Sequence, residues 1–138
     1  MKYFVDTSFW CALYDLGDIN HDSAKKIWNT LARSPVKLFI TDYIFDETVT
    51  VISSRMDRQS GINLGRTLLE SKVVTMVRIN EEYFNSGWDL LQTCTDKNYS
   101  FTDCTSFTVM HSFELNKALA YDHHFMQMGF TVNQVFIK

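Results

Sequence analysis

The sequence predicts an α/β domain: a three-layer α/β/α sandwich with a mainly parallel central sheet. The first observation behind this prediction is that short apolar runs alternate with segments whose apolar residues recur at helical spacing. Strands joined by crossover helices form parallel sheets with helices on both faces. The second observation is length, because 138 residues suit one domain with a core of its own. We therefore expect residues 1–138 to form a single domain.

Composition and charge narrow the class of protein. No apolar run approaches the length of a membrane span, and the N-terminus lacks the pattern of a signal peptide, so a cytoplasmic protein is expected. Cys11, Cys94 and Cys104 show no C-x-x-C pairing, which predicts reduced thiols. The net charge of −3 argues against a protein that binds nucleic acid through overall positive charge. It does not exclude a metal-dependent nuclease, because the ion supplies local positive charge.

Apolar patterning and helix-capping residues define the expected elements. Strands are expected at Lys2–Val5, Lys37–Ile40, Val73–Val77, Lys117–Tyr121 and Val132–Ile137. Helices are expected at Thr7–Tyr14, from Asn20 or Asp22 through Arg33, from Thr41 or Asp42 through about Arg58, at Ile62–Ser71, after an Asn80 cap, and from a Thr102 cap through about Phe113. Asp122–Gln127 is expected to be a turn or short helix, and Ser60 with Gly61 is expected to separate the third helix from the fourth.

Two acids directly follow expected strands. Asp6 comes after Lys2–Val5, and Asp122 comes after the strand that ends at Tyr121. Ligands of open parallel sheets bind outside the carboxyl ends of the strands, so neighbouring strands would bring both carboxylates to one edge. Each Asp alone is better explained as a helix cap or turn residue.

Two further acids lie on the apolar faces of expected helices. Glu47 shares helical spacing with Ile44 and Val51, whereas Asp46 falls on the wetter face and is expected to be solvated. Because an ionised carboxylate is costly to bury unpaired, Glu47 needs either an ion pair with Arg or Lys or a functional partner. Asp103 lies on an inward stripe in the first turn of its helix, where the helix dipole also favours an anion.

The four acids together indicate a metal site. Clustered carboxylates repel one another and raise one another's pKa values, which a cation would relieve. Ligands that are all oxygen suit Mg²⁺ or Mn²⁺ rather than zinc. The chemistry that fits is phosphodiester hydrolysis, in which the metal activates a water and polarises the phosphate.

The order and spacing of these motifs resemble the PIN-domain ribonucleases, in particular the toxins of VapBC-type toxin–antitoxin pairs of bacteria and archaea. The resemblance runs nearly end to end and rests on Val5-Asp6-Thr7-Ser8, Glu47, Phe101-Thr102-Asp103, Asp122 followed by Phe125, and Gly129-Phe130. One departure is the basic residue often found in the family just after the last acid, where this chain has His123 and His124.

The resemblance implies an α/β/α sandwich and an endoribonuclease that depends on Mg²⁺ or Mn²⁺. It implies that Asp6 and Asp103 bind the metal directly, that Asp122 binds it directly or through water, and that all three are catalytic. Glu47 would complete the catalytic set by orienting water or holding a second ion. The implied partners are an RNA substrate, a cognate antitoxin that blocks the acidic pocket or the groove leading to it, and a second copy of the chain.

The resemblance also implies that a neighbouring hydroxyl, that of Thr7, Ser8 or Thr102, would hydrogen-bond a carboxylate and fix its rotamer.

Other classes of protein share parts of this pattern. A phosphatase of the haloacid-dehalogenase type also begins with a strand and an Asp, but it needs a second acid two residues on, where this chain has Ser8. A receiver domain needs an acid pair, a central Asp and a late Lys that are not found. The alternative hypothesis is a PIN-like fold that serves as a non-catalytic interaction module. Loss of one or more acids would favour it, but all four are present.

Overall fold

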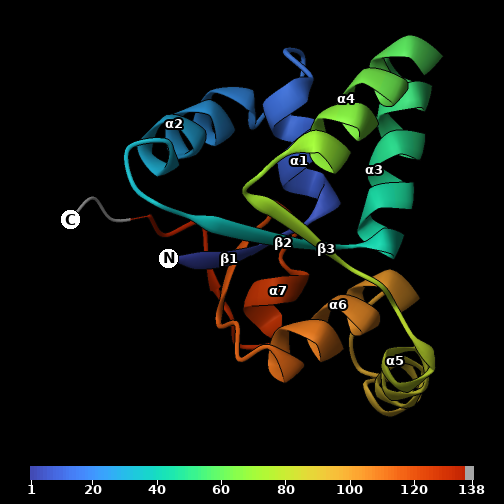
Figure 1. Ribbon diagram of the computed structural model, residues 1–138. Coiled ribbons are helices and arrows are strands. Elements are labelled where there is room, and N and C mark those ends of the chain that lie inside the picture. The colour runs from blue at the N-terminus through green and yellow to red at the C-terminus, as the bar shows by residue number, and fades with distance from the viewer. Residues whose placement is uncertain (136–138) are drawn as a thin grey trace.

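A parallel sheet forms the centre of the structure. The computed structural model describes residues 1–135, and within them the sheet has five strands in the order β3-β2-β1-β4-β5, each pair parallel. The strands are β1 (Lys2–Val5), β2 (Lys37–Thr41), β3 (Val74–Val77), β4 (Lys117–Leu119) and β5 (Thr131–Val132). The carboxyl ends of β1, β2 and β3 point to the right in Figure 1, toward the start of α3.

Helices cover both faces of this sheet (Figure 1). One face carries α1 (Thr7–Tyr14), α2 (His21–Leu31), α3 (Asp42–Arg55) and α4 (Arg58–Glu70). The other face carries α5 (Glu81–Thr93), α6 (Phe101–Ser112) and α7 (His124–Gln127). The predicted three-layer α/β/α sandwich with a parallel sheet is therefore confirmed.

The order of the strands creates a switch point beside β1. The chain builds outward from β1 to β2 and β3, and then returns to place β4 on the other side of β1. Crossover helices consequently leave β1 and β4 toward opposite faces, which opens a crevice at the carboxyl ends of these two strands. The backbone N–H of Asp6 donates to the carbonyl of Leu119 (2.9 Å) and holds the two strand ends together.

The core is centred on β1. Tyr3, Phe4 and Val5 are all completely buried, as an apolar run in a covered parallel sheet should be. Phe4 stacks on Phe125 of α7 with a centroid separation of 5.9 Å, and Phe107 of α6 packs edge-on against the same ring at 5.0 Å. Full burial of each such ring stabilises the fold by about 1.5–3 kcal/mol relative to exposure.

The boundary between α3 and α4 differs from the prediction. We expect from the sequence a helix through about Arg58 and a break at Ser60 and Gly61, but α3 ends at Arg55 and Asp57 caps α4 by accepting from the Ser60 N–H (2.7 Å). Gly61 lies inside α4 because a Cβ there would collide with the Ser53 side chain and lie 2.9 Å from the Val49 carbonyl oxygen. The glycine permits close helix packing instead of ending a helix.

The C-terminal strands are shorter than predicted. β4 ends at Leu119, and the side chain of Asn133 then pairs with the backbone of Ala120, donating to its carbonyl (2.7 Å) and accepting from its N–H (2.9 Å). The predicted strand Val132–Ile137 is confirmed at Val132 but wrong at residues 133–135, because β5 is Thr131–Val132 and Asn133 adopts a positive φ of 58°. Its last two residues lie outside the described residues.

Three other boundaries shift by one or two residues. α2 ends at Leu31, where Arg33 is predicted, β2 extends to Thr41, and β3 begins at Val74. Asn20 stands at the N-cap position of α2 without a side-chain capping bond. Such shifts at element ends are ordinary and do not change the topology.

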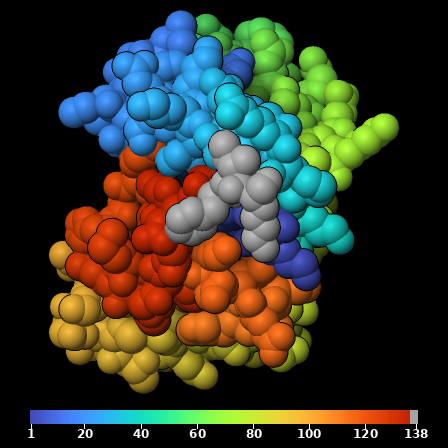
Figure 2. Space-filling view, turned by 90° about the vertical axis from the view of Figure 1, so that its left-hand side faces the viewer, coloured from blue at the N-terminus to red at the C-terminus, as the bar shows by residue number. Residues whose placement is uncertain are grey.

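The amino-terminal edge of the sheet carries a cavity of about 630 Å³, lined mostly by apolar side chains together with Lys2, Ser34 and Lys37. Figure 2 faces this end of the molecule and shows the N-terminal segments above the C-terminal ones. The hydroxyl of Tyr3 reaches the carbonyl of Gln134 here (3.3 Å). No acid lines this cavity, so it lies apart from the carboxylates.

Among the described helices, none has the length and apolar character needed to cross a bilayer.

Replacing Gly61 by alanine is expected to lower the free energy of unfolding by about 1–2 kcal/mol, because the added methyl overpacks the contact between α3 and α4. Gly17→Ala is the matched control, since its Cβ would meet only Asp15 Oδ1 at 3.4 Å. We expect that control to stay within about 0.5 kcal/mol of wild type. Urea unfolding followed by circular dichroism measures both variants, and equal stabilities would contradict the packing role of Gly61.

Candidate functional site

Asp6 occupies the first position after β1 and caps α1. Its side chain is only 3% exposed, and Oδ2 accepts from both the N–H (3.1 Å) and the hydroxyl (2.6 Å) of Ser8. The Ser8 hydroxyl in turn accepts from the backbone N–H of Tyr121 (2.8 Å). Ser8 therefore ties the end of β1 to the segment after β4 and fixes the rotamer of Asp6.

Asp103 is held in the first turn of α6 by a capping box. The predicted cap at Thr102 is wrong, because α6 begins at Phe101 and Ser100 is the N-cap. The Ser100 hydroxyl accepts from the Asp103 N–H (3.0 Å), and Asp103 Oδ2 accepts from the Ser100 N–H (3.0 Å). This reciprocal pairing satisfies two helix-end donors and leaves Asp103 buried with a fixed carboxylate.

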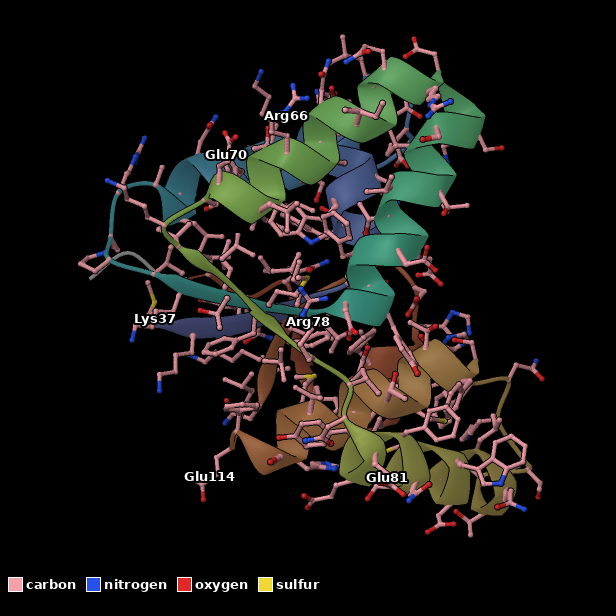
Figure 3. The ribbon with its side chains drawn as sticks, turned by 45° about the vertical axis from the view of Figure 1, so that its right-hand side comes forward. Lys37, Arg66, Glu70, Arg78, Glu81 and Glu114 are labelled. Carbon is pink, nitrogen blue, oxygen red and sulfur yellow. The ribbon has the colours of Figure 1, made fainter. Side chains whose placement is uncertain are left out.

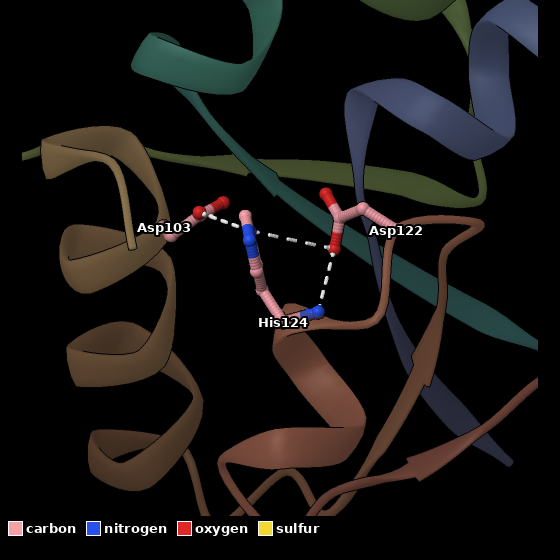
Figure 4. A group of neighbouring side chains, drawn as sticks. All are labelled: Asp103, Asp122 and His124. Carbon is pink, nitrogen blue, oxygen red and sulfur yellow. Dashed lines mark hydrogen bonds and ion pairs between the residues drawn. The ribbon is translucent and has the colours of Figure 1, made fainter. Parts of the chain in front are cut away.

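Asp122, in the segment after β4, and His124, the first residue of α7, meet Asp103 of α6 (Figure 4). The His124 N–H donates to Asp122 Oδ1 (3.1 Å). The ring nitrogen Nδ1 of His124 lies 2.7 Å from Asp103 Oδ2 and 3.9 Å from Asp122 Oδ1. The contact with Asp103 is an ion pair that lowers the pKa of Asp103, although its geometry does not meet the criteria of an aligned hydrogen bond.

Glu47 lines the wall of a cleft of about 500 Å³ that opens between α3 and the start of α6, with Tyr43 and Phe101 beside it. Glu47 is half-buried, whereas Asp46 is exposed, as predicted. The hydroxyl of Thr7 lies next to Glu47 and lowers its pKa, against a larger upward effect of burial.

Charge repulsion links all four acids. Burial raises the pKa of Asp6 well above its usual value, and the charge of Asp122 raises it further, while the two Ser8 hydrogen bonds lower it. Burial likewise raises the pKa of Glu47 and that of Asp103, and the charge of Asp122 adds to both shifts. The carboxylates that follow β1 and β4 and those on α3 and α6 are thus close enough to influence one another.

The donor set fits a divalent cation. Within residues 1–135, the only ion-pair partner of these four acids is His124, which pairs with Asp103 and Asp122. The ion pair with Arg or Lys that was one explanation for Glu47 is therefore not found among these residues. Arg55 pairs instead with Asp18 (2.9 Å), and Arg66 projects from the outer side of α4 (Figure 3). Buried carboxylates without a cationic side chain are costly, and a bound Mg²⁺ or Mn²⁺ would offset that cost with the oxygen ligands that these ions prefer.

Sequence reasoning missed two contributors to this arrangement. Ser100 carries a recognisable signal, because the spacing Ser100-x-x-Asp103 is that of a capping box. His124 carries none, since a histidine in a predicted turn is expected to be exposed, and only the folded chain places its ring against Asp103. Of the proposed supports, Ser8 bonds a carboxylate, while Thr102 lines the cleft.

The chain belongs to the PIN-domain family, whose model matches residues 3–131. The resemblance drawn from the motifs is thereby confirmed. Sequence relatives belong to the VapC group. The 23S rRNA-specific endonuclease VapC20 of Mycobacterium tuberculosis is 33% identical over 127 residues, which cover 92% of this chain and 94% of that protein. A VapC ribonuclease of Archaeoglobus fulgidus is 26% identical, over 91% of this chain and 80% of that protein.

Solved structures show the same fold. The crystal structure of M. tuberculosis VapC20, a toxin that cleaves the sarcin–ricin loop, superposes with a TM-score of 0.86 at 31% identity, over 94% of this chain and 96% of that chain. VapBC2 from Rickettsia felis, bound to a DNA fragment of its promoter, gives a TM-score of 0.68 at 11% identity, over 96% of this chain and 97% of that chain.

Ser8→Ala is expected to lower the free energy of unfolding by about 1–3 kcal/mol, because it removes a hydrogen bond from buried Asp6 and leaves the Tyr121 N–H without its acceptor. Ser23→Ala is the matched control, since Ser23 bonds the hydroxyl of the same Tyr121 (2.6 Å) at an exposed position. That variant should change stability by no more than about 0.5 kcal/mol. Chemical denaturation in EDTA compares the two, and an equal loss would contradict the linking role of Ser8.

The metal-free protein is expected to lose stability as pH rises from the ordinary carboxyl range toward neutrality. The pKa values of Asp6, Glu47 and Asp103 are raised, so the folded state binds more protons than the unfolded state in that window and the free energy of unfolding falls with pH. Asp103→Asn removes one of these groups and should make the decline shallower. Urea unfolding in EDTA between about pH 4 and pH 7 measures how the free energy of unfolding changes with pH. If that change is the same in Asp103→Asn as in wild type, the raised pKa of Asp103 is refuted.

Proposed function

We propose that this protein is a metal-dependent endoribonuclease that hydrolyses RNA phosphodiester bonds, and that it is the toxin of a VapBC-type pair. The observation that carries the proposal is a group of four carboxylates whose charges act on one another without an Arg or Lys partner among the described residues, with Asp103 and Asp122 close enough to share one ion. Relatives named as an rRNA-specific endonuclease and as a VapC ribonuclease support the same activity.

The proposed roles follow from how each carboxylate is held. Asp6 and Asp103 are buried and fixed by serine hydrogen bonds, which suits direct ligands of Mg²⁺ or Mn²⁺. Asp122 is more open and would bind the ion directly or through water. When bound, such an ion supplies Lewis-acid activation of a water and of the scissile phosphate.

Glu47 is proposed to complete the catalytic set from the wall of the cleft. Its carboxylate is half-buried, and burial raises its pKa, which makes it a stronger proton acceptor. Glu47 would therefore orient the attacking water and accept its proton, or hold a second ion. The adjacent opening, bordered by Tyr43 and Phe101, gives an extended RNA strand room to lie against Glu47.

The proposed partners are a cognate antitoxin, the RNA substrate and a second copy of the chain. The antitoxin is supported by VapC sequence relatives and by the fold shared with a VapBC complex. It would act by covering the acidic pocket or the cleft beside Glu47. The homodimer follows only from the family resemblance and stays a prediction.

Asp6→Asn and Asp103→Asn are each expected to reduce RNA cleavage by about 100-fold or more, because each removes a fixed anionic ligand. The assay incubates ribosomal RNA and total cellular RNA with Mg²⁺ or Mn²⁺, with and without EDTA, and resolves the products by electrophoresis. EDTA should abolish cleavage by the wild type.

Asp89→Asn is the matched control, since Asp89 is an exposed acid on α5 away from the cluster, and it should cleave like wild type. Cleavage that survives both Asp6→Asn and Asp103→Asn would refute the proposed site. A folded wild type that binds Mn²⁺ but cleaves none of these RNAs would favour the alternative, a non-catalytic PIN-like interaction module.

A further inference from the structure

We propose that Nδ1 of His124 is itself a ligand of the metal ion, beside the carboxylates of Asp103 and Asp122. The centre would then bind its ion through one nitrogen and several oxygens. This inference rests on the proposed metal-dependent function and adds to it a ligand that the family resemblance does not supply.

The spacing of the three side chains suits one ion. For ligand bonds near 2.1 Å, octahedral geometry places adjacent ligand atoms about 3.0 Å apart and opposite ones about 4.2 Å apart. His124 Nδ1 lies 2.7 Å from Asp103 Oδ2 and 3.9 Å from Asp122 Oδ1. One donor atom from each of the three residues falls within 4.8 Å of the other two. Figure 4 shows the imidazole standing between the two carboxylates.

The ring nitrogen also lacks another partner. Nδ1 is buried and makes no aligned hydrogen bond, although the Asp103 oxygen is near. The rest of His124 is anchored, because its N–H donates to Asp122 and its ring packs edge-on against Tyr99 with a centroid separation of 5.6 Å. Buried polar atoms in native proteins nearly always have well-aligned partners. Nδ1 has only the ion-pair contact with Asp103, and a metal ion between the two carboxylates would give its lone pair an aligned ligand bond.

His123 does not share these properties. It is exposed and stands at the N-cap position of α7 without a side-chain capping bond. Its ring lies 5.1 Å from that of His124, on the same short segment, so it differs from His124 chiefly in its direction and burial. His123 is therefore a matched control for any effect of an imidazole near the acids.

A nitrogen ligand changes which ion the centre prefers. Mg²⁺ favours oxygen ligands, whereas first-row transition ions gain more from imidazole. We therefore expect wild type to discriminate between Mn²⁺ and Mg²⁺ more strongly than His124→Asp, which restores an all-oxygen set.

The test uses Mn²⁺ as the probe with the full chain. Pulsed electron paramagnetic resonance should detect a nitrogen hyperfine coupling on bound Mn²⁺ in wild type and in His123→Gln, and none in His124→Gln. Calorimetric titration should give a Mn²⁺ affinity about 10–100-fold weaker for His124→Gln, with His123→Gln within about twofold of wild type. Circular dichroism checks that each variant folds. If His124→Gln does not fold, His124→Asp replaces it in the test, because it should bind Mn²⁺ without the nitrogen coupling.

The outcomes separate this inference from the proposed function. Bound Mn²⁺ whose affinity falls in Asp103→Asn but which shows no nitrogen coupling in wild type would overturn the role of His124 and leave the metal centre standing. A coupling that persists in both His124 variants would also overturn it. Absence of Mn²⁺ binding, or binding unaffected by Asp103→Asn, would overturn both proposals.

Discussion

Carboxylates that are brought together out of water repel one another and lose their hydration, and the carboxyl edge of this sheet gathers four of them. Asp6 and Asp103 are almost fully buried, and the structure offers them hydroxyl and amide donors from Ser8 and Ser100 in place of a positively charged Arg or Lys. Those hydrogen bonds orient the charges without neutralising them, as the raised pKa values of both acids indicate. The fold thus maintains an unfavourable concentration of negative charge that a cation would relieve. Functional sites commonly cost stability in this way, and the rest of the fold supplies it.

Topology determines where that charge is gathered. Because β1 stands between β2 and β4, the residues that follow β1 and β4 meet at one edge, and the helices that follow β2 and β3 approach the same edge from opposite faces. Asp6 and Asp122 come from the edge itself, while Glu47 comes from the second turn of α3 and Asp103 from the first turn of α6. Each acid is fixed by a different part of the chain, so the geometry depends on the packing of the whole sandwich.

Local features of this protein could be predicted from its sequence, and features that depend on distant contacts could not. The bounds of β1 and α1 match the prediction because an apolar run followed by Asp-Thr-Ser determines both locally. Gly61 was predicted to end a helix, yet its role comes from α3, a neighbour that the local pattern does not reveal. The same limit applies to Asn133, whose side chain continues a strand thirteen residues away in sequence, and to His124, whose burial depends on α6. The positions of the four acids were predictable, whereas the hydrogen bonds that orient them were only partly so.

The hydrogen bond from the Tyr121 N–H to the Ser8 hydroxyl joins residues 113 positions apart in the chain. During synthesis, the first strand and its acid are made long before the segment that completes their surroundings, and the contact cannot form until that segment exists. Contacts over such a sequence distance also form slowly. A nascent or partly folded chain therefore holds separate carboxylates but no assembled centre. For a protein proposed to cleave RNA, this order of events would delay RNA cleavage until nearly the entire described chain has been translated and folded.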